Sequence, residues 1–293
     1  MRQLVVTADD VGLAPEMTRG ALEAAERGIV TAVSVASVGD AFDEAIGALR
    51  GLPQLDVGAH LVLVGERPLS PPVEVPSLVG RDGRLLAGFG AFCARYAHGG
   101  VAMAEVRREL ARQLERLLDT GLPVRHLNSH QHLHALPRVF EVVAALAEKH
   151  AIPFVRVPED PLLPPPLTPR ALALRGLRLL ARRGRRRLSA DSPVATLDGT
   201  LGITAAGHLS VAHLRELLAG PWSGRCELVC HPGSGGAGLA SRYRWGYAWD
   251  AERETLCDPA LPVLLARHGI ELSSFSGLAA AAPLGQAGAG RLG

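Results

Sequence analysis

Residues 4–12 read LVVTADDVG, a short apolar run that leads into two adjacent carboxylates. The apolar run predicts a buried strand, and residues 15–27 then carry Met17, Ala21 and Ala24 at helical spacing before Gly28 ends the pattern. This unit of one strand and one helix is the element from which the rest of the chain is built.

The unit recurs along the chain about seven or eight times. Further strands are expected at residues 30–36, 55–63, 124–128, 154–157, 227–230 and 270–275, and helices at residues 40–50, 102–120, 137–150, 211–218 and 251–267. Such alternation is typical of parallel strands joined by right-handed crossovers, and this many units favours a closed barrel. The sequence therefore predicts an α/β fold, a TIM-like (β/α) barrel of seven or eight parallel strands.

Three segments depart from the alternation. Residues 65–88 are rich in Pro and Gly and are interpreted as an inserted loop, residues 160–193 as a second insertion, and the Ala/Gly-rich residues 279–293 as a disordered tail. Without the tail and the first insertion the 293-residue chain keeps 254 residues, close to the roughly 250 of a one-domain barrel. We therefore predict a single domain over residues 1–278.

Composition narrows the class of protein. An apolar fraction of 47% supports a sizeable core, and a net charge of +2 gives no reason to expect nucleic acid as a partner. Four scattered cysteines do not form a disulfide framework, and we find neither a signal peptide nor an apolar stretch long enough for a membrane helix. The expected location is the cytoplasm.

In a barrel of this kind, functional residues lie just after the C-terminal ends of the strands. Acid and imidazole groups occupy such positions on four expected strands, namely Asp9 and Asp10, His60, His130 and His231. Agreement among four separate strands indicates one shared site.

The densest signal is the segment 126–134, HLNSHQHLH, which holds four of the eleven histidines. Imidazole is the commonest transition-metal ligand, and the period of two in an extended segment lets one or two of these rings face the barrel mouth. We assign Asn128, His132 and His134 to the support of the ligands. The alternative is a polar loop whose histidines bind backbone groups.

A ligand set of Asp10, His60 and His130 leaves coordination positions open, which suits catalysis. A metal in such a site lowers the pKa of bound water from 15.7 to about 7 and polarises a carbonyl, as amide hydrolysis requires. The imidazoles favour Zn²⁺, whereas the carboxylate also admits Mg²⁺ or Mn²⁺. Asp9 is then the expected base and His231 the expected acid; the alternatives are a loop cap and a turn histidine.

Four motifs resemble one known family. Residues 4–12 (LVVTADDVG), 58–63 (GAHLVL), 125–134 (RHLNSHQHLH) and 229–233 (VCHPG) resemble, in this order, the YdjC-type carbohydrate deacetylases, which include chitooligosaccharide deacetylases. The resemblance covers residues 2–276. It implies a barrel related to polysaccharide deacetylases, removal of an acetyl group from an acetylated amino sugar, metal ligands at Asp10, His60 and His130, a base at Asp9 and a late histidine at His231.

The chain departs from that family at Asn128, where many members have Asp. The Asn resembles the hopanoid-biosynthesis branch, which implies a lipid-linked amino sugar as the substrate. The segment 170–187 contains eight arginines and no acid, with leucines interleaved. It is interpreted either as a basic amphipathic helix in peripheral contact with the inner membrane face or as a solvated insertion.

Aromatic side chains are scarce, yet Tyr243, Trp245, Tyr247 and Trp249 alternate within seven positions. We assign the first three to substrate binding because aromatic faces stack on sugars, with a buried strand edge or a homodimer contact as the alternative. Arg156 is expected to hold the substrate or to orient Asp9.

The predicted function is metal-dependent hydrolysis of the N-acetyl group of an amino sugar. A metal-dependent phosphoesterase is the first alternative, because the same ligands would support it, and a non-catalytic sugar-binding or membrane-associated barrel is the second. The presence of both Asp9 and His231 argues against the non-catalytic alternative, because binding alone needs neither a base nor an acid.

Overall fold

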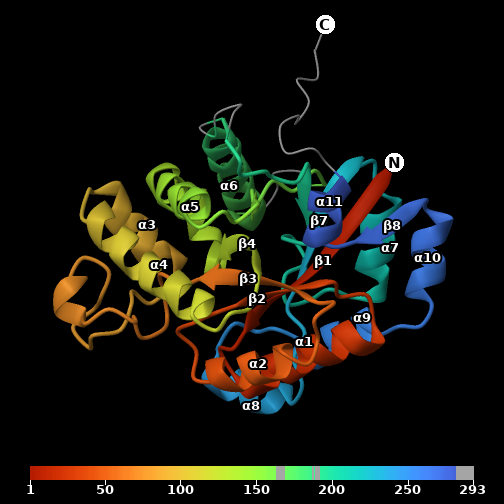
Figure 1. Cartoon of the computed structure of the whole chain (residues 1–293), viewed down its shortest axis with the longest axis horizontal. Coiled ribbons are helices and arrows are strands. Elements are labelled where there is room, and N and C mark those ends of the chain that lie inside the picture. The colour runs from red at the N-terminus through yellow and green to blue at the C-terminus, as the bar shows by residue number, and fades with distance from the viewer. Residues whose placement is uncertain (163–168, 187, 189–191, 282–293) are drawn as a thin grey trace, which may run out of the picture.

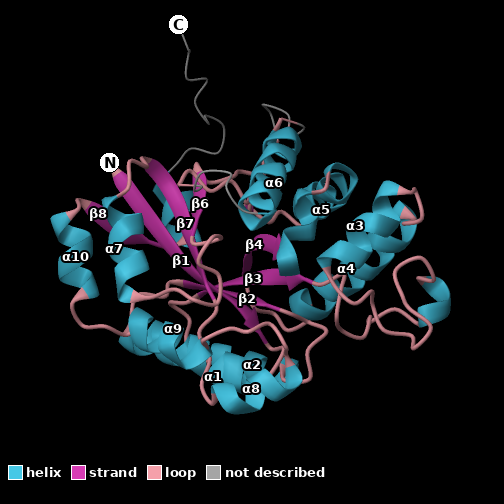
Figure 2. Ribbon diagram, turned by 180° about the vertical axis from the view of Figure 1, so that it is seen from behind, coloured by secondary structure: helices cyan, strands magenta, loops and turns pink. Residues whose placement is uncertain are grey.

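A curled sheet of eight parallel strands forms the centre of the molecule, with helices around it (Figures 1 and 2). The computed structural model describes residues 1–162, 169–186, 188 and 192–281. Seven strands follow the order β5-β4-β3-β2-β1-β7-β6, and the eighth pairs with β1. The strands are β1 Arg2–Val11, β2 Ala32–Val35, β3 Asp56–Leu61, β4 Val124–Ser129, β5 Phe154–Val155, β6 Gly199–Leu201, β7 Gly224–Cys230 and β8 Ile270–Ser273.

The prediction of seven or eight parallel strands is confirmed, although β6 was not among the expected strands, and the prediction of a closed barrel is not confirmed. Within the described residues, β5 and β6 share no ladder, and only a single bridge between Phe154 and Ala195 spans the interval. The reason is local, because β5 is only two residues long and the chain leaves the sheet after it for the second insertion. The sheet is therefore a half-barrel.

The helices surround this sheet. They are α1 Pro15–Arg27, α2 Phe42–Leu49, α3 Phe89–Ala97, α4 Met103–Leu118, α5 Pro137–Lys149, α6 Pro169–Arg185, α7 Val211–Ala219, α8 Gly236–Arg242, α9 Trp249–Leu256, α10 Leu261–Arg267 and α11 Phe275–Ala281, with short 3₁₀ turns at Pro72–Glu74 and His130–Ala135.

Three expectations about helices need correction. The helix expected over residues 251–267 is two helices, α9 and α10, because Pro259 between them and Pro262 in the first turn of α10 have no backbone N–H to continue the hydrogen bonding of α9. Helices α3 and α8 were not predicted. Helix α11 includes residues 279–281, which the sequence assigned to the tail, and the remainder of that tail lies outside the described residues.

The end of the sheet where the strands begin is filled by a small apolar cluster. Val5, Ala32 and Phe154 of three strands meet Phe275 and Leu278 of α11 across the curl. Asp56, at the start of β3, accepts hydrogen bonds from the backbone N–H and the hydroxyl of Ser276. Helix α11 is thereby fixed as a plug, and the polar residues are left to the opposite end.

Above this plug the interior becomes polar. His126 of β4 stacks on Phe275 with ring centroids 4.2 Å apart, and its Nε2 lies 2.9 Å from the hydroxyl of Ser34 on β2. The ring occupies space that Gly58 of β3 leaves free, since a Cβ on Gly58 would lie 2.3 Å from it. Residue 58 must therefore lack a side chain for His126 to fit.

The first insertion, residues 65–88, is tied to α4 by buried polar groups. Glu109, fully buried on α4, accepts hydrogen bonds from the backbone N–H groups of Leu69 and Ser70 at 2.9 and 2.8 Å. Gln113 bonds to both backbone groups of Val62. Because these groups lie just after β3, they hold the start of the insertion against α4 at the carboxyl end of the sheet.

The fit between Gly58 and His126 predicts a specific stability effect. Gly58→Ala should lower the free energy of unfolding by about 1–3 kcal/mol, as overpacking of a filled core does, measured by urea denaturation. Gly47→Ala is the matched control, because Gly47 lies in α2 with open space around it and should be neutral or stabilising. Equal midpoints for the two variants would show that the ring moves aside without cost.

Candidate metal centre and catalytic groups

The polar residues singled out in the sequence meet at the carboxyl end of the sheet. Asp9 and Asp10 belong to the end of β1, which is longer than predicted, and His60 is next to last on β3. His130 and His231 directly follow β4 and β7, and Arg156 directly follows β5. Parallel pairing therefore places all six at one edge.

Asp10, His60 and His130 form one compact cluster. The Oδ1 atom of Asp10 lies 3.1 Å from Nε2 of His60 and 2.9 Å from Nδ1 of His130, and those two ring nitrogens are 3.4 Å apart. All three residues are buried, and their ligand atoms lie within 4.8 Å of one another. One carboxylate oxygen and two imidazole nitrogens converging in this way fit a divalent transition ion.

Asn128 fixes which nitrogen of His60 is available. Its amide nitrogen donates to Asp9 Oδ1 at 3.1 Å and to Ser34 Oγ at 2.7 Å, so its oxygen faces His60 Nδ1 at 2.7 Å. The carboxylate of Asp9 only accepts, which sets the amide orientation and requires a proton on His60 Nδ1. The Nε2 lone pair of His60 is thus left facing the cluster, as a metal ligand needs.

Asp9 is held as a buried anion by Arg156. The guanidinium donates to both oxygens of Asp9 at 2.5 and 2.9 Å and to both oxygens of Glu227 at 2.8 and 2.7 Å. Burial raises the pKa of Asp9, but the charges of Arg156 and His60 outweigh it and hold that pKa well below its usual value. Of the two roles expected for Arg156, the geometry favours orientation of Asp9 over contact with substrate.

Strained backbone conformations are concentrated in and beside the cluster of Asp10, His60 and His130. Four non-glycine residues of the described chain have positive φ, and three of them, Asp10, Gln131 and His132, belong to the cluster or its flank. Such conformations cost about 1–3 kcal/mol each and persist where the surroundings impose them. Here the strained turn after β4 gives His130 its position beside Asp10.

His132 and His134 do not contact the cluster through any hydrogen bond in the described residues. His134 Nε2 donates to the carbonyl of Arg156 at 2.9 Å and Nδ1 accepts from Ser129, while burial lowers its pKa to about 3. Burial also lowers the pKa of His132 well below its usual value. His134 therefore supports the β4 and β5 ends as a neutral ring, whereas Asn128 is the residue that touches a ligand.

The alternating aromatic side chains divide into two pairs. Tyr243 and Trp249 are buried, and the Tyr243 hydroxyl donates to the carbonyl of Leu13 at 3.3 Å. Trp245 and Tyr247 are partly exposed, with ring centroids 5.0 Å from His130 and 5.2 Å from His231 respectively. The second pair thus lies between the ligand cluster and His231, whereas the contacts of Tyr243 are those of a core residue.

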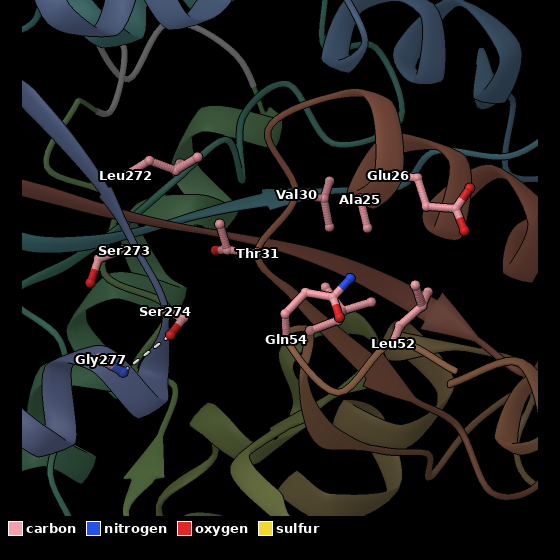
Figure 3. Close-up of a pocket in the computed structure, with 11 residues that line it drawn as sticks. Ala25, Glu26, Val30, Thr31, Leu52, Gln54, Leu272, Ser273, Ser274 and Gly277 are labelled. Atoms are coloured by element: carbon pink, nitrogen blue, oxygen red, sulfur yellow. Dashed lines mark hydrogen bonds between the residues drawn. The ribbon is translucent and has the colours of Figure 1, made fainter. Parts of the chain in front are cut away.

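One cavity of the molecule lies away from these groups. A cavity of about 430 Å³ is bordered by the end of α1, the start of β2, the end of β8 and α11, with Glu26, Gln54, Leu272 and Ser273 among its lining residues (Figure 3). None of the residues that line it belongs to the cluster. The chemistry is therefore assigned to the carboxyl edge of the sheet and not to this cavity.

Comparison with known proteins agrees with the geometry. The family model described as YdjC-like protein matches residues 3–267. The chain belongs to the YdjC-like family. A carbohydrate deacetylase of Geobacillus stearothermophilus is 30% identical to this YdjC-like protein over 94% of the chain and 97% of the relative. A chitooligosaccharide deacetylase of Serratia marcescens is 28% identical, over 94% and 98%.

Solved structures support the same fold. A proposed cellobiose-phosphate cleavage protein of Enterococcus faecalis V583 superimposes with a TM-score of 0.73 at 24% identity, over 94% of this YdjC-like chain and 98% of that one. Among the described residues no helix combines the length and the apolar character needed to cross a bilayer.

Two polar partners of the site escaped sequence reasoning. Glu227 lies inside an apolar strand, and a buried acid there was a signal that a cation must face it. Ser34 lies within the strand expected at residues 30–36, and a hydroxyl group in a strand is too common to indicate a functional residue. Neither residue follows a strand end, so the strand-end rule could not select them.

Removal of one ligand should abolish metal binding by this YdjC-like protein. His60→Ala and His130→Ala each remove an imidazole from a three-residue set, so metal titration by calorimetry should show at least about a hundredfold weaker binding. His98→Ala, an exposed histidine on the far side of α3, is the control and should bind as the parent does. Unchanged affinity in both ligand variants would rule out the cluster as the metal site.

Proposed function

We propose that this protein is a metal-dependent carbohydrate deacetylase that hydrolyses the N-acetyl group of an amino sugar. The observation that carries the proposal is the juxtaposition of the ligand cluster with Asp9, an anion joined to the ligand His60 through Asn128. The names of the relatives from Geobacillus and Serratia support the same reaction class.

Each residue has a distinct task in this reaction. Asp10, His60 and His130 hold the metal, which when bound polarises the acetyl carbonyl and lowers the pKa of water. Asp9 takes the proton from the attacking water, and Arg156 keeps its carboxylate aligned. His231 gives a proton to the nitrogen as the C–N bond breaks, so that a neutral amine departs.

Sugar binding is assigned to Trp245 and Tyr247. Their rings lie 5.5 Å apart and flank the two histidines that face the reacting amide. Aromatic faces stack on the apolar faces of pyranose rings, so this pair would hold the sugar with its acetamide toward the cluster. The homodimer suggested by the same aromatic segment stays a prediction.

The need for a placed proton donor favours deacetylation over a phosphoesterase, and the buried charges favour it over a binding protein. A phosphoesterase would use the same metal ligands, but an alkoxide leaving group depends less on a placed acid than an amine does. A binding protein would have no use for the Asp9–Arg156–Glu227 arrangement, because three buried charges are costly to assemble.

Asp9→Asn should separate binding from turnover. The variant keeps the ligands Asp10, His60 and His130, so metal content should stay at the parental level, while acetate release from N-acetylated amino sugars should fall by about 10²–10⁴-fold. Metal analysis and an acetate assay check the two outcomes. Normal turnover by Asp9→Asn would refute the base, and phosphate release from sugar phosphates without acetate release would favour the phosphoesterase.

The metal itself is proposed to be Zn²⁺, with Mg²⁺ and Mn²⁺ as the alternatives. Two of the three ligand atoms are imidazole nitrogens, which Zn²⁺ prefers, whereas Mg²⁺ is bound mainly by oxygen. After chelation and dialysis, activity should return at lower concentrations of Zn²⁺ than of Mg²⁺. Full recovery with Mg²⁺ but not Zn²⁺ would reverse the assignment.

The acceptor is proposed to be a lipid-linked amino sugar, and helix α6 supports this. Leu172 and Leu179 are 58% and 69% exposed, and the exposed residues Arg175, Arg183 and Arg186 share the outward arc with them. An arc of leucines flanked by arginines is typical of helices that lie on anionic bilayers. The side chain of Arg170 and the whole of Arg187 lie outside the described residues.

The inward arginines of α6 have a different role. Arg178, Arg182 and Arg185 all lie within 4.0 Å of the carboxylate of Glu159, and α6 packs on α5. These three anchor the helix to the rest of the fold, and the membrane contact is proposed for the exposed arginines of the outward arc. Helix α6 also contacts the turn His130–Ala135, which begins at the ligand His130.

Vesicle binding tests the membrane contact. The test variant carries three substitutions together, Arg175→Ser, Arg183→Ser and Arg186→Ser. In sedimentation assays its binding to vesicles that contain phosphatidylglycerol should be weaker by about 3 kcal/mol, at about 1 kcal/mol per arginine. The control combines Arg81→Ser, Arg107→Ser and Arg267→Ser, which removes the same charge from exposed positions elsewhere. Equal binding of the two triple variants would contradict a specific role for α6.

A further inference from the structure

A second buried carboxylate lies beside the catalytic groups and has no task in the reaction as described so far. Glu252 of α9 is fully buried, and its Oε1 accepts the backbone N–H of His231 at 2.6 Å. Its Oε2 accepts the backbone N–H of Leu209 at 3.3 Å. The carboxylate thus joins α9 to the end of β7 and to the loop before α7.

The same carboxylate faces the imidazole of His231. Oε1 of Glu252 lies 3.9 Å from Nδ1 of His231, and that nitrogen is buried without a hydrogen bond among the described residues. The Tyr247 ring packs against the imidazole in a T-shaped arrangement, with ring centroids 5.2 Å apart. A rotation of the imidazole would bring Nδ1–H toward the carboxylate, and within the described part of the chain no other acceptor is hydrogen bonded to this nitrogen.

We propose that Glu252 is a positioning residue that receives Nδ1–H of His231 and so presents Nε2–H to the leaving nitrogen. This inference rests on the proposed deacetylation and adds to it the group that sets the tautomer and the charge of the acid. In the step concerned, the Nε2 proton moves to the amide nitrogen while the C–N bond breaks and its electron pair stays on nitrogen. His231 becomes neutral, and Glu252 remains hydrogen bonded to Nδ1–H throughout.

The charges around His231 explain why such a partner is needed. Burial lowers the pKa of His231, and the neighbouring Arg156 guanidinium lowers it further, whereas Asp10 and Asp9 raise it. Because Asp9 is already paired with Arg156, and Asp10 lies against two imidazoles, their support for an imidazolium at His231 is shared with other groups. Within the described part of the chain, His231 is the one group able to carry a positive charge that lies within 4.0 Å of the Glu252 carboxylate.

Glu252 itself titrates in the working range. Burial raises its pKa to about 7, against the opposing effect of the two backbone N–H groups. A carboxylate beside Nδ1–H favours the protonated form of His231, which is the form that can act as the acid. Loss of that proton at higher pH should make turnover decline. Removal of the Glu252 charge should move that decline to lower pH.

Glu252→Gln is the main test, because glutamine keeps an acceptor for one backbone N–H but cannot carry the charge. The alkaline limb of kcat should move down by about one pH unit, which corresponds to about tenfold lower kcat at pH 8. Metal content and KM should remain within twofold. An unshifted alkaline limb would overturn the proposal.

A second substrate makes the result independent of folding. Hydrolysis of p-nitrophenyl acetate releases a phenolate that needs no proton, so Glu252→Gln should retain ester hydrolysis while losing amide hydrolysis. Equal losses on both substrates would show a structural role only. Glu252→Asp should recover part of the amide activity, because it restores the charge.

Glu109→Gln is the matched control. Glu109 is also fully buried and also accepts two backbone N–H groups, but on α4, away from His231. Its pH profile should equal that of the parent, and a shift like that of Glu252→Gln would refute the assignment. If the parent protein released no acetate from any acetylated sugar, the proposed function itself would fail, whereas amide hydrolysis by the parent with an unshifted pH profile in Glu252→Gln would overturn the role of Glu252 alone.

Discussion

The arrangement at the carboxyl end of the sheet depends on one buried cation. The guanidinium of Arg156 is almost inaccessible and donates to two carboxylates, Asp9 from β1 and Glu227 from β7. Because an unpaired charge in such surroundings is very unfavourable, the end of β1, the end of β5 and the middle of β7 must come together for any of the three residues to be stable. The base of the proposed reaction is thus part of the framework.

The next layer follows from the charge of Asp9. The part of the Asp9 carboxylate that Arg156 leaves free can only accept a hydrogen bond, and the amide nitrogen of Asn128 donates it. The orientation of the amide then fixes the proton on His60, which in turn directs a lone pair toward Asp10 and His130. An aspartate at position 128 would place two carboxylates about 3 Å apart, so Asn at this position fits the present neighbours without the need for an extra proton.

Much of this arrangement could be predicted from the sequence, for a physical reason. Alternation of strands and helices determines parallel pairing, and parallel pairing brings Asp9, Asp10, His60, His130 and His231 to one edge without knowledge of any distance. Interior partners were less predictable, because Glu227 and Ser34 act through spatial neighbours that the spacing does not encode. The two-residue length of β5, and hence the open barrel, follows from the irregular segment after it, where the apolar period gave no signal.

The pairing of β1 has a consequence for how the protein is made. Its first residue in the sheet, Arg2, lies opposite Ile270 of β8 and Gly224 of β7, while Ala8 lies opposite Val33 of β2. Strand β1 therefore reaches its full set of neighbours only after β8, more than 250 residues later in the sequence, has been synthesised. During translation the apolar segment 4–6 lacks its final strand partners. Pairing between strands that are far apart in the sequence also slows folding. A nascent chain of this protein is thus expected to need shielding by a chaperone until β8 has emerged.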